Sequence, residues 1–135
     1  MTIEPLLIPV SPGELFDKIS ILQIKSERLR HPEQRAHVRH ELAQLRPVEH
    51  ACRQRHPTAA AVIEAASHQL KAVNERLWDI EDAVRRCEQT ERFDVEFIAL
   101  ARQVYMLNDQ RFALKRTINQ ALQADIVEEK SYASG

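Results

Sequence analysis

Glycine is almost missing from this 135-residue chain, which contains only Gly13 and Gly135. Glycine supplies the tight turns of β-hairpins and the backbone of phosphate-binding loops, so the sequence leaves little room for either. The sequence also lacks a paired CxxC motif and a nucleophile-elbow motif. These absences favour a helical protein and remove the common signatures of nucleotide-binding and hydrolytic enzymes.

Long apolar segments are missing as well. Residues 1–10 contain no basic residue, and Glu4, Pro5 and Pro9 interrupt their short apolar run. A secretory signal needs a positive start and an unbroken apolar stretch of about 7–15 residues, and a membrane span needs about 18. We therefore expect a soluble, cytoplasmic protein with no membrane association, and its length suffices for one domain with its own core.

Charge of one sign is not in excess, because 19 lysines and arginines oppose 20 acids to give a net charge of −1. Without a general positive field, we expect no binding of nucleic acid. The charges are nevertheless unevenly distributed. Residues 28–56 hold seven arginines and three glutamates, a net charge of +4, whereas residues 74–96 hold eight acids and four bases, a net charge of −4. Two such segments can attract each other within one chain or between two chains.

Cysteine is scarce, and histidine is concentrated in one region. Cys52 and Cys87 lie far apart on segments of helical pattern, which favours reduced thiols over a disulfide. His37, His40 and Glu41 have the spacing with which one helix can chelate a metal, but nothing in the sequence supplies a fixed outer shell. We expect no metal and no cofactor, and the histidines fit a surface that responds to pH.

All six prolines precede residue 58 and divide the first half of the chain. Pro5 and Pro9 predict an extended N-terminal arm over residues 1–11, because proline and the residue before it avoid helical backbone angles. Apolar periodicity predicts helices near residues 12–30, 33–55, 58–88 and 94–123. Pro47 should kink or split the second of these helices.

The third and fourth helices carry regular apolar seams. The seam of the third helix runs through Ala66, Leu70, Val73, Leu77, Ile80, Val84 and Cys87. The seam of the fourth helix runs through Phe97, Leu100, Val104, Leu107, Leu114, Ile118 and Leu122. Two such helices, each roughly 42–45 Å long, should form an antiparallel hairpin. The predicted fold class is all-α: an elongated bundle of about four helices in one domain over residues 1–135, with a tail over residues 124–135.

The length of this hairpin also bears on assembly. Helices of this length exceed what a domain with a radius of gyration of about 14 Å needs. Their apolar ends would then overhang the core, and the oppositely charged segments could pair between chains. We therefore expect an isologous homodimer.

Polar residues interrupt the apolar pattern of the fourth helix. Arg111 stands in the seam between Leu107 and Leu114, and other polar residues follow at steps of three or four. The members of this polar stripe are Tyr105, Asn108, Asp109, Arg111, Lys115 and Asn119. One interpretation is a buried network that fixes helix register, with Asp109 or Glu14 as the acid that pairs with Arg111. The other is a binding site whose amides and cations hold an anionic or hydroxylated small molecule, or a partner segment.

Charged residues of the first helix and of the tail complete this candidate site. The first helix begins with a capping serine at Ser11, and its apolar residues surround most of the cylinder. Its out-of-place charges are Glu14, Asp17, Lys18 and Lys25, of which the two lysines could face the polar stripe. The tail has no helical period but is too apolar to be fully solvated, so we expect it to fold back. A tail carboxylate would then pair with a cation of the site and a tyrosine would cover the pocket mouth, which makes the tail candidates Glu128, Glu129 and Tyr132.

Three stretches of the sequence form a recognisable set. The first is IPVSPGELFDKISILQIK at residues 8–25, the second is LWDIED at residues 77–82, and the third is YMLNDQR at residues 105–111, followed by IN at 118–119 and EEKSY at 128–132. Together they resemble a family of small bacterial proteins known as a domain of unknown function, whose marks are a GExxDKxxILxIK start and an EEKSY end. The resemblance implies a cytoplasmic helical protein, sometimes encoded near genes for cell-surface polysaccharide synthesis, and it implies no activity.

Two classes of function remain. The first is a binding or accessory protein whose polar stripe holds a small ligand or a partner segment. The second is a cofactor-independent enzyme that acts on a small anionic substrate, such as a sugar phosphate or nucleotide sugar. Such an enzyme would need an acid or a base in a cleft, for which the candidates are Glu14, Asp17, Asp109 and Glu128. We favour the first class.

Overall fold

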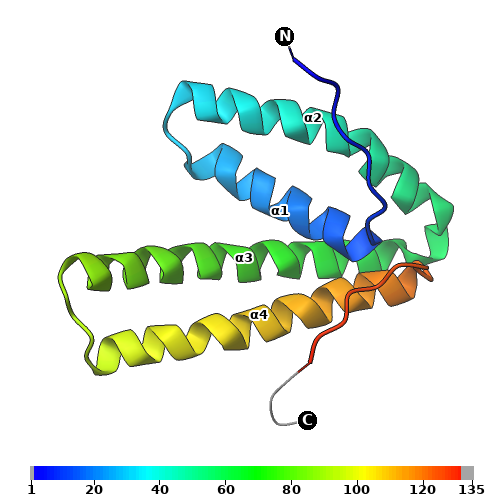
Figure 1. Ribbon diagram of the computed structural model, residues 1–135. Coiled ribbons are helices and arrows are strands. Elements are labelled where there is room, and N and C mark those ends of the chain that lie inside the picture. The colour runs from blue at the N-terminus through cyan, green and yellow to red at the C-terminus, as the bar shows by residue number, and fades with distance from the viewer. Residues whose placement is uncertain (1, 132–135) are drawn as a thin grey trace.

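The chain folds into two helical hairpins, and the computed structural model describes residues 2–131 of it (Figure 1). The elements in chain order are α1 (Pro12–Arg28), α2 (Pro32–Arg55), the single 3-10 turn η1 (Pro57–Ala59), α3 (Ala60–Gln89) and α4 (Val95–Ala121). Within residues 2–131 there is no strand. The predicted all-α bundle of four helices is therefore confirmed. None of these helices combines the length and apolar composition that crossing a bilayer requires within the described part of the chain.

Helix α1 lies at the centre of the packing and contacts α2, α3 and α4. Its first turn is fixed by Ser11, whose Oγ accepts a hydrogen bond from the backbone amide of Glu14 at 3.2 Å, while Pro12 occupies the first helical position. Apolar side chains are buried all around the helix, as the sequence predicts, and they are Leu15, Phe16, Ile19, Leu22 and Ile24. The helix ends at Arg28, two residues before the predicted end.

Helix α2 covers the outer side of α1 and has one buried residue, Val38. Pro47 lies inside this helix and does not split it, so that part of the prediction is wrong. A proline removes the hydrogen bond to the carbonyl four residues earlier, and here that residue, Ala43, is exposed. Water can therefore satisfy the freed carbonyl. Figure 1 shows α2 curving over its second half towards the start of α3.

Helices α3 and α4 form the predicted antiparallel hairpin and make the most extensive helix contact in the structure. Their seams form two clusters. One contains Ile63, Ala66, Leu70, Ile118 and Leu122 with Phe16 of α1, and the other contains Val73, Leu77, Ile80 and Leu107. Glu91 reverses the chain between the helices with a positive φ of 54°, and Asp94 caps α4 by accepting hydrogen bonds from two backbone amides.

The start of α1 lies unusually close to α4. The backbone amide of Gly13 donates a hydrogen bond of 2.7 Å to Oδ1 of Asn119, and both residues are buried. A Cβ atom added to Gly13 would lie 2.5 Å from the carbonyl oxygen of Lys115. Only glycine permits this approach, because a contact so short is closer than packed atoms allow.

Replacing Gly13 by alanine tests this close approach. In an ordinary helix, glycine to alanine stabilises by up to about 1 kcal/mol. We expect the opposite here, a loss of about 1–3 kcal/mol in the free energy of unfolding, because α1 must move away from α4. Urea unfolding measures the change. A variant as stable as the wild-type protein, or more stable, would show that α1 and α4 are not held at this distance.

Candidate functional site

Asp17 is the centre of a buried polar network that joins α1, α3 and α4. Its carboxylate belongs to a residue that is 2% exposed, and it receives two hydrogen bonds from Arg111: Nε to Oδ1 at 2.9 Å and Nη2 to Oδ2 at 2.5 Å. Nδ2 of Asn74 also donates to Oδ1 of Asp17 at 3.0 Å and to Oγ of Ser20 at 2.8 Å. Three helices are thus tied to one carboxylate, and bidentate geometry fixes its orientation.

The partner of Arg111 differs from the predicted one. Asp109 and Glu14 were the expected acids, but Asp17 pairs with Arg111. Asp109 lies two residues before Arg111, which places it on a different side of α4, and it lies 3.9 Å from Nζ of Lys130. The hydrogen bonds from Arg111 to Asp17 raise the pKa of the guanidinium above its ordinary value, so Arg111 stays charged.

Lys115 lies one turn farther along α4 and is buried, with 6% of the residue exposed. Its Nζ is 2.9 Å from Oε2 of Glu14 and 3.0 Å from Oε1 of Glu128. Burial alone would lower the pKa of Lys115, but hydrogen bonds to Glu14 and Glu128 outweigh burial and raise it. The prediction that a tail carboxylate pairs with a cation of the site is confirmed for Glu128.

The tail reaches Lys115 because the chain turns back after α4. Gln123 has a positive φ of 52°, the left-handed conformation that commonly ends a helix. The tail then runs back past α4 (Figure 1). Besides the contact of Glu128, Lys130 lies 3.9 Å from Asp109 and its Nζ is 5.4 Å from the ring centre of Phe112. The tail is therefore held at two places along α4.

Several predicted site residues lie elsewhere. Lys18 follows Asp17 by one residue, which turns it towards α2, where its Nζ pairs with Glu41 at 3.0 Å. Lys25 is half-buried on α1 and makes no ion pair with any residue from 2 to 131. Tyr105 and Glu129 are exposed. Tyr132 lies outside the described residues.

Asn74 and Ser20 were missed at the level of sequence. The signal was present for Asn74, because this amide stands four residues after Leu70 and three before Leu77 on the apolar side of α3. Both residues are buried. A buried amide needs partners for its donors and its acceptor, so its place in an apolar stripe predicts a polar neighbour across the helix interface.

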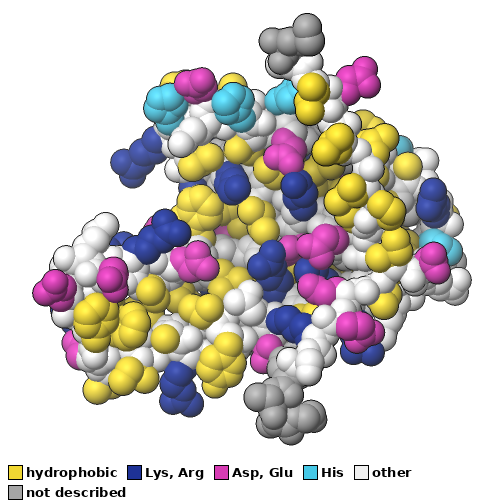
Figure 2. Space-filling model, in the orientation of Figure 1, with side chains coloured by type: hydrophobic (Ala, Val, Ile, Leu, Met, Phe, Trp, Pro, Cys, Tyr) yellow, Lys and Arg dark blue, Asp and Glu magenta, His cyan; other side chains and the backbone are white. Residues whose placement is uncertain are grey.

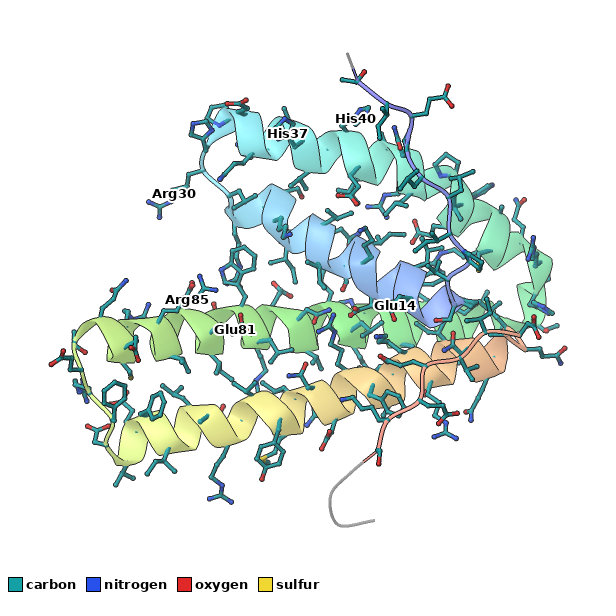
Figure 3. The ribbon with its side chains drawn as sticks, viewed as in Figure 1. Glu14, Arg30, His37, His40, Glu81 and Arg85 are labelled. Atoms are coloured by element: carbon teal, nitrogen blue, oxygen red, sulfur yellow. The ribbon has the colours of Figure 1, made fainter. Side chains whose placement is uncertain are left out.

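A pocket of about 150 Å³ opens beside this network, between α1, α3 and α4. Its walls are formed by Ile21, Ile24, Asn74, Leu77, Trp78, Glu81, Asn108 and Arg111. Nε and Nη2 of Arg111 face Asp17, and its third nitrogen, Nη1, makes no hydrogen bond with any described residue. Figure 3 shows Glu81 on α3 towards the hairpin turn, whereas Glu14 lies where α1 begins. The pocket thus lies on one side of the Asp17–Arg111 pair, and Lys115 with Glu14 and Glu128 lies on the other side.

The histidine-rich helix contributes nothing to this site. Figure 3 shows His37 and His40 on the side of α2 that faces away from the other helices. Glu41 is engaged with Lys18. Over residues 2–131, no three His, Cys, Asp or Glu side chains are grouped so that they could hold a metal ion. Cys52 and Cys87 are both free thiols.

Comparison with known protein families assigns the chain to one of them. The model of a family of unknown function, DUF6165, matches residues 6–135, and therefore almost the whole chain. The chain belongs to the DUF6165 family. No curated protein and no solved structure matches it. Because membership of DUF6165 assigns no activity, the function has to be argued from the chemistry of the site.

Replacing Arg111 by methionine tests how strongly the network depends on its ion pair. The change leaves Asp17 buried beside Asn74 without a cation, and we expect a loss of about 3 kcal/mol in the free energy of unfolding. Adding Asp17→Asn should recover most of that loss, because the buried charge is removed and the amide oxygen can still accept from Asn74. Lys18→Met, on the same helix as Asp17, is the control, since its exposed pair with Glu41 contributes less than about 1 kcal/mol. Equal losses for Arg111→Met and Lys18→Met in urea unfolding would contradict this account.

Replacing Glu128 by glutamine tests the anchoring of the tail. Lys115 keeps Glu14 but loses one of two charged partners, so we expect a loss of about 1–2 kcal/mol. Glu129→Gln, one residue on and exposed, should change stability by less than about 0.5 kcal/mol.

Because the pKa of Lys115 is raised above 10.5, its stabilising charge persists below that value and is lost only as the pH rises further. The difference between wild type and Glu128→Gln should therefore be constant between about pH 7 and 9; a difference that shrinks over this range would show that Lys115 loses its proton early.

Proposed function

We propose that this DUF6165 chain is a helical binding protein whose pocket beside Arg111 takes one small hydroxylated molecule, such as a single sugar ring. The observation that carries the proposal is Nη1 of Arg111. Arg111 lines the pocket, and Nη1 is the one guanidinium nitrogen that Asp17 does not hold. A charged donor with no protein partner recruits an acceptor from solvent or from a ligand.

The charge of the pocket favours a hydroxyl over a phosphate. Asp17 already neutralises Arg111, and Glu81 adds a further negative charge to the wall. The other buried cation, Lys115, is held by Glu14 and Glu128. An anion would therefore enter a region with a surplus of carboxylates, whereas a hydroxyl can accept from Arg111 and donate to Glu81 at the same time.

The remaining walls suit a ring with polar edges. Trp78 offers an aromatic surface, Ile21 and Ile24 are apolar, and Asn108 has both a donor and an acceptor. The volume of about 150 Å³ is below the roughly 300–1,000 Å³ of pockets for drug-sized ligands. One small ring with several hydroxyls matches both the size and the mixture of polar and apolar walls.

The protonation of Arg111 and Lys115 suits hydrogen-bond donation. A general acid or base works best when its pKa lies near the operating pH. The pKa values of Arg111 and Lys115 are raised, away from neutrality, by their carboxylate partners. Both groups therefore hold their protons, which suits fixed hydrogen-bond donors. The cofactor-independent enzyme, with a carboxylate as its acid or base, is the second candidate.

Trp78 makes the proposal directly testable, because it is the single tryptophan of the chain and lines the pocket. We expect its fluorescence to change on titration with at least one member of a panel of methyl hexosides, with a dissociation constant of roughly 1 mM. The matching hexose phosphates should bind no better. Asn108→Leu should weaken binding about tenfold, because the hydroxyl that it contacts loses its partner.

Gln110→Leu is the matched control for this titration. Gln110 lies two residues along α4 and lines a separate groove between α3 and α4, so binding should be unchanged. Phosphorylated sugars that bind more tightly than the neutral ones would contradict the charge argument. They would favour the alternative function, an enzyme that acts on a small anionic substrate. Binding that survives Asn108→Leu would place the ligand outside this pocket.

A further inference from the structure

The N-terminal arm exposes a run of apolar side chains to solvent. Residues 2–10 are extended, as the sequence predicts, and Figure 1 shows them passing over α2 and away from the helices. Ile3, Leu6, Leu7 and Ile8 are 83%, 84%, 94% and 73% exposed. Single exposed apolar residues are ordinary, but a contiguous run marks an interaction surface.

A groove begins where this arm joins the body. Its first part, of about 200 Å³, lies between the base of the arm and α2, and its second part, of about 390 Å³, continues to the end of α4 and the start of the tail. Val10, Pro12, Cys52 and Arg55 line both parts, so the two parts are continuous. In Figure 2, hydrophobic side chains gather along the arm and over the adjoining part of α2.

The arm does not fill the groove of its own chain. Of the arm residues 2–10, only Val10 lines either part. The walls of the first part are mainly apolar and those of the second part are mixed, and their apolar residues include Leu15, Val48, Leu122 and Ile126. The groove therefore offers an apolar surface of the kind that the exposed arm needs, at the point from which the arm departs.

Charge also matches the arm to the groove. Glu4 is the one charged residue of the arm, and it is exposed. Arg55 lines both parts of the groove and makes no ion pair with any residue between 2 and 131. His56 and Asp125 are the other titratable groups of the second part besides Cys52. A single acid on the arm and a single arginine in the groove can form one ion pair per chain.

We propose that two copies of this chain exchange their arms, so that the arm of each copy lies in the groove of the other. Because the groove starts at the base of the arm, a twofold axis at that point brings each arm to the partner's groove without rearranging the helices. Nine extended residues reach about 30 Å. Pro5 and Pro9 restrict the arm before it binds, which lowers the entropy lost on docking.

The size of this interface is that of a stable dimer. The arm and the groove together involve about 20 residues of each chain, and stable protein interfaces contain about 20–30 residues on each side. The exchange buries the run of exposed apolar side chains, which is the driving force, while the Glu4–Arg55 pair sets the register.

A charge swap tests the exchange. In the full-length protein, Glu4→Arg and Arg55→Glu should each weaken the dimer at least tenfold, because each places like charges opposite one another in both halves of the interface. An equimolar mixture of the two variants should restore the dimer, since both arms then meet a groove of opposite charge. Sedimentation equilibrium at micromolar concentration measures the association. Both positions are exposed, and circular dichroism with thermal melting checks that the variants keep the helical fold.

Arg39→Glu is the matched control, because Arg39 is an exposed arginine on the same helix but outside the groove. It should dimerise like the wild-type protein. A wild-type protein that is monomeric, or single variants that dimerise as tightly as the wild type, would overturn the proposal. A mixture that stays monomeric would also overturn it and would indicate that each arm folds onto its own chain or binds another protein.

Discussion

The bidentate ion pair between Asp17 and Arg111 is the contact on which the arrangement of α1 against α3 and α4 depends. A carboxylate that is 2% exposed is stable only with a cation and hydrogen bonds around it. Arg111 supplies the cation from α4, and Asn74 supplies an amide donor from α3. Since Asp17 lies on the central helix, rotating or sliding α1 by one residue would separate it from both partners. The pair therefore fixes both the angle and the register of the first hairpin on the second.

The same pair also sets the charge of the neighbouring surfaces. With Arg111 neutralised by Asp17 and Lys115 enclosed by Glu14 and Glu128, the cations that make the sequence look like an anion site are already occupied. What remains beside Arg111 is its Nη1 donor, an aromatic wall and a carboxylate, on which the proposed binding of a neutral polar ring rests. Of the two interpretations of the polar stripe, the structure thus supports the buried network between helices, with a pocket beside Arg111.

The helices could be predicted from the sequence because the two signals that define them are local. Proline ends segments, and apolar seams keep the period of a helix. The site could be predicted in part, because Arg111 and Lys115 break an apolar seam. The partner of Arg111 could not, since α1 is apolar on nearly every side and its rotation is set only by packing, whereas the pairing of Lys115 with a tail carboxylate could. Asp17 and Lys18 are adjacent in sequence, yet one faces α4 and the other faces α2. Pro47 shows the limit of a local signal, because the free-energy cost of a proline inside a helix depends on whether water reaches the carbonyl that lost its hydrogen bond.

The separation of Asp17 and Arg111 along the chain has a consequence for synthesis. Arg111 follows Asp17 by 94 positions along the chain. At about 5–20 residues per second, Asp17 leaves the ribosome roughly 5–20 s before Arg111 does. Until then, the first hairpin presents an unpaired carboxylate on the side that α4 later covers. The first hairpin is therefore expected to remain loosely packed during translation, and the whole chain to become ordered in one step when α4 arrives.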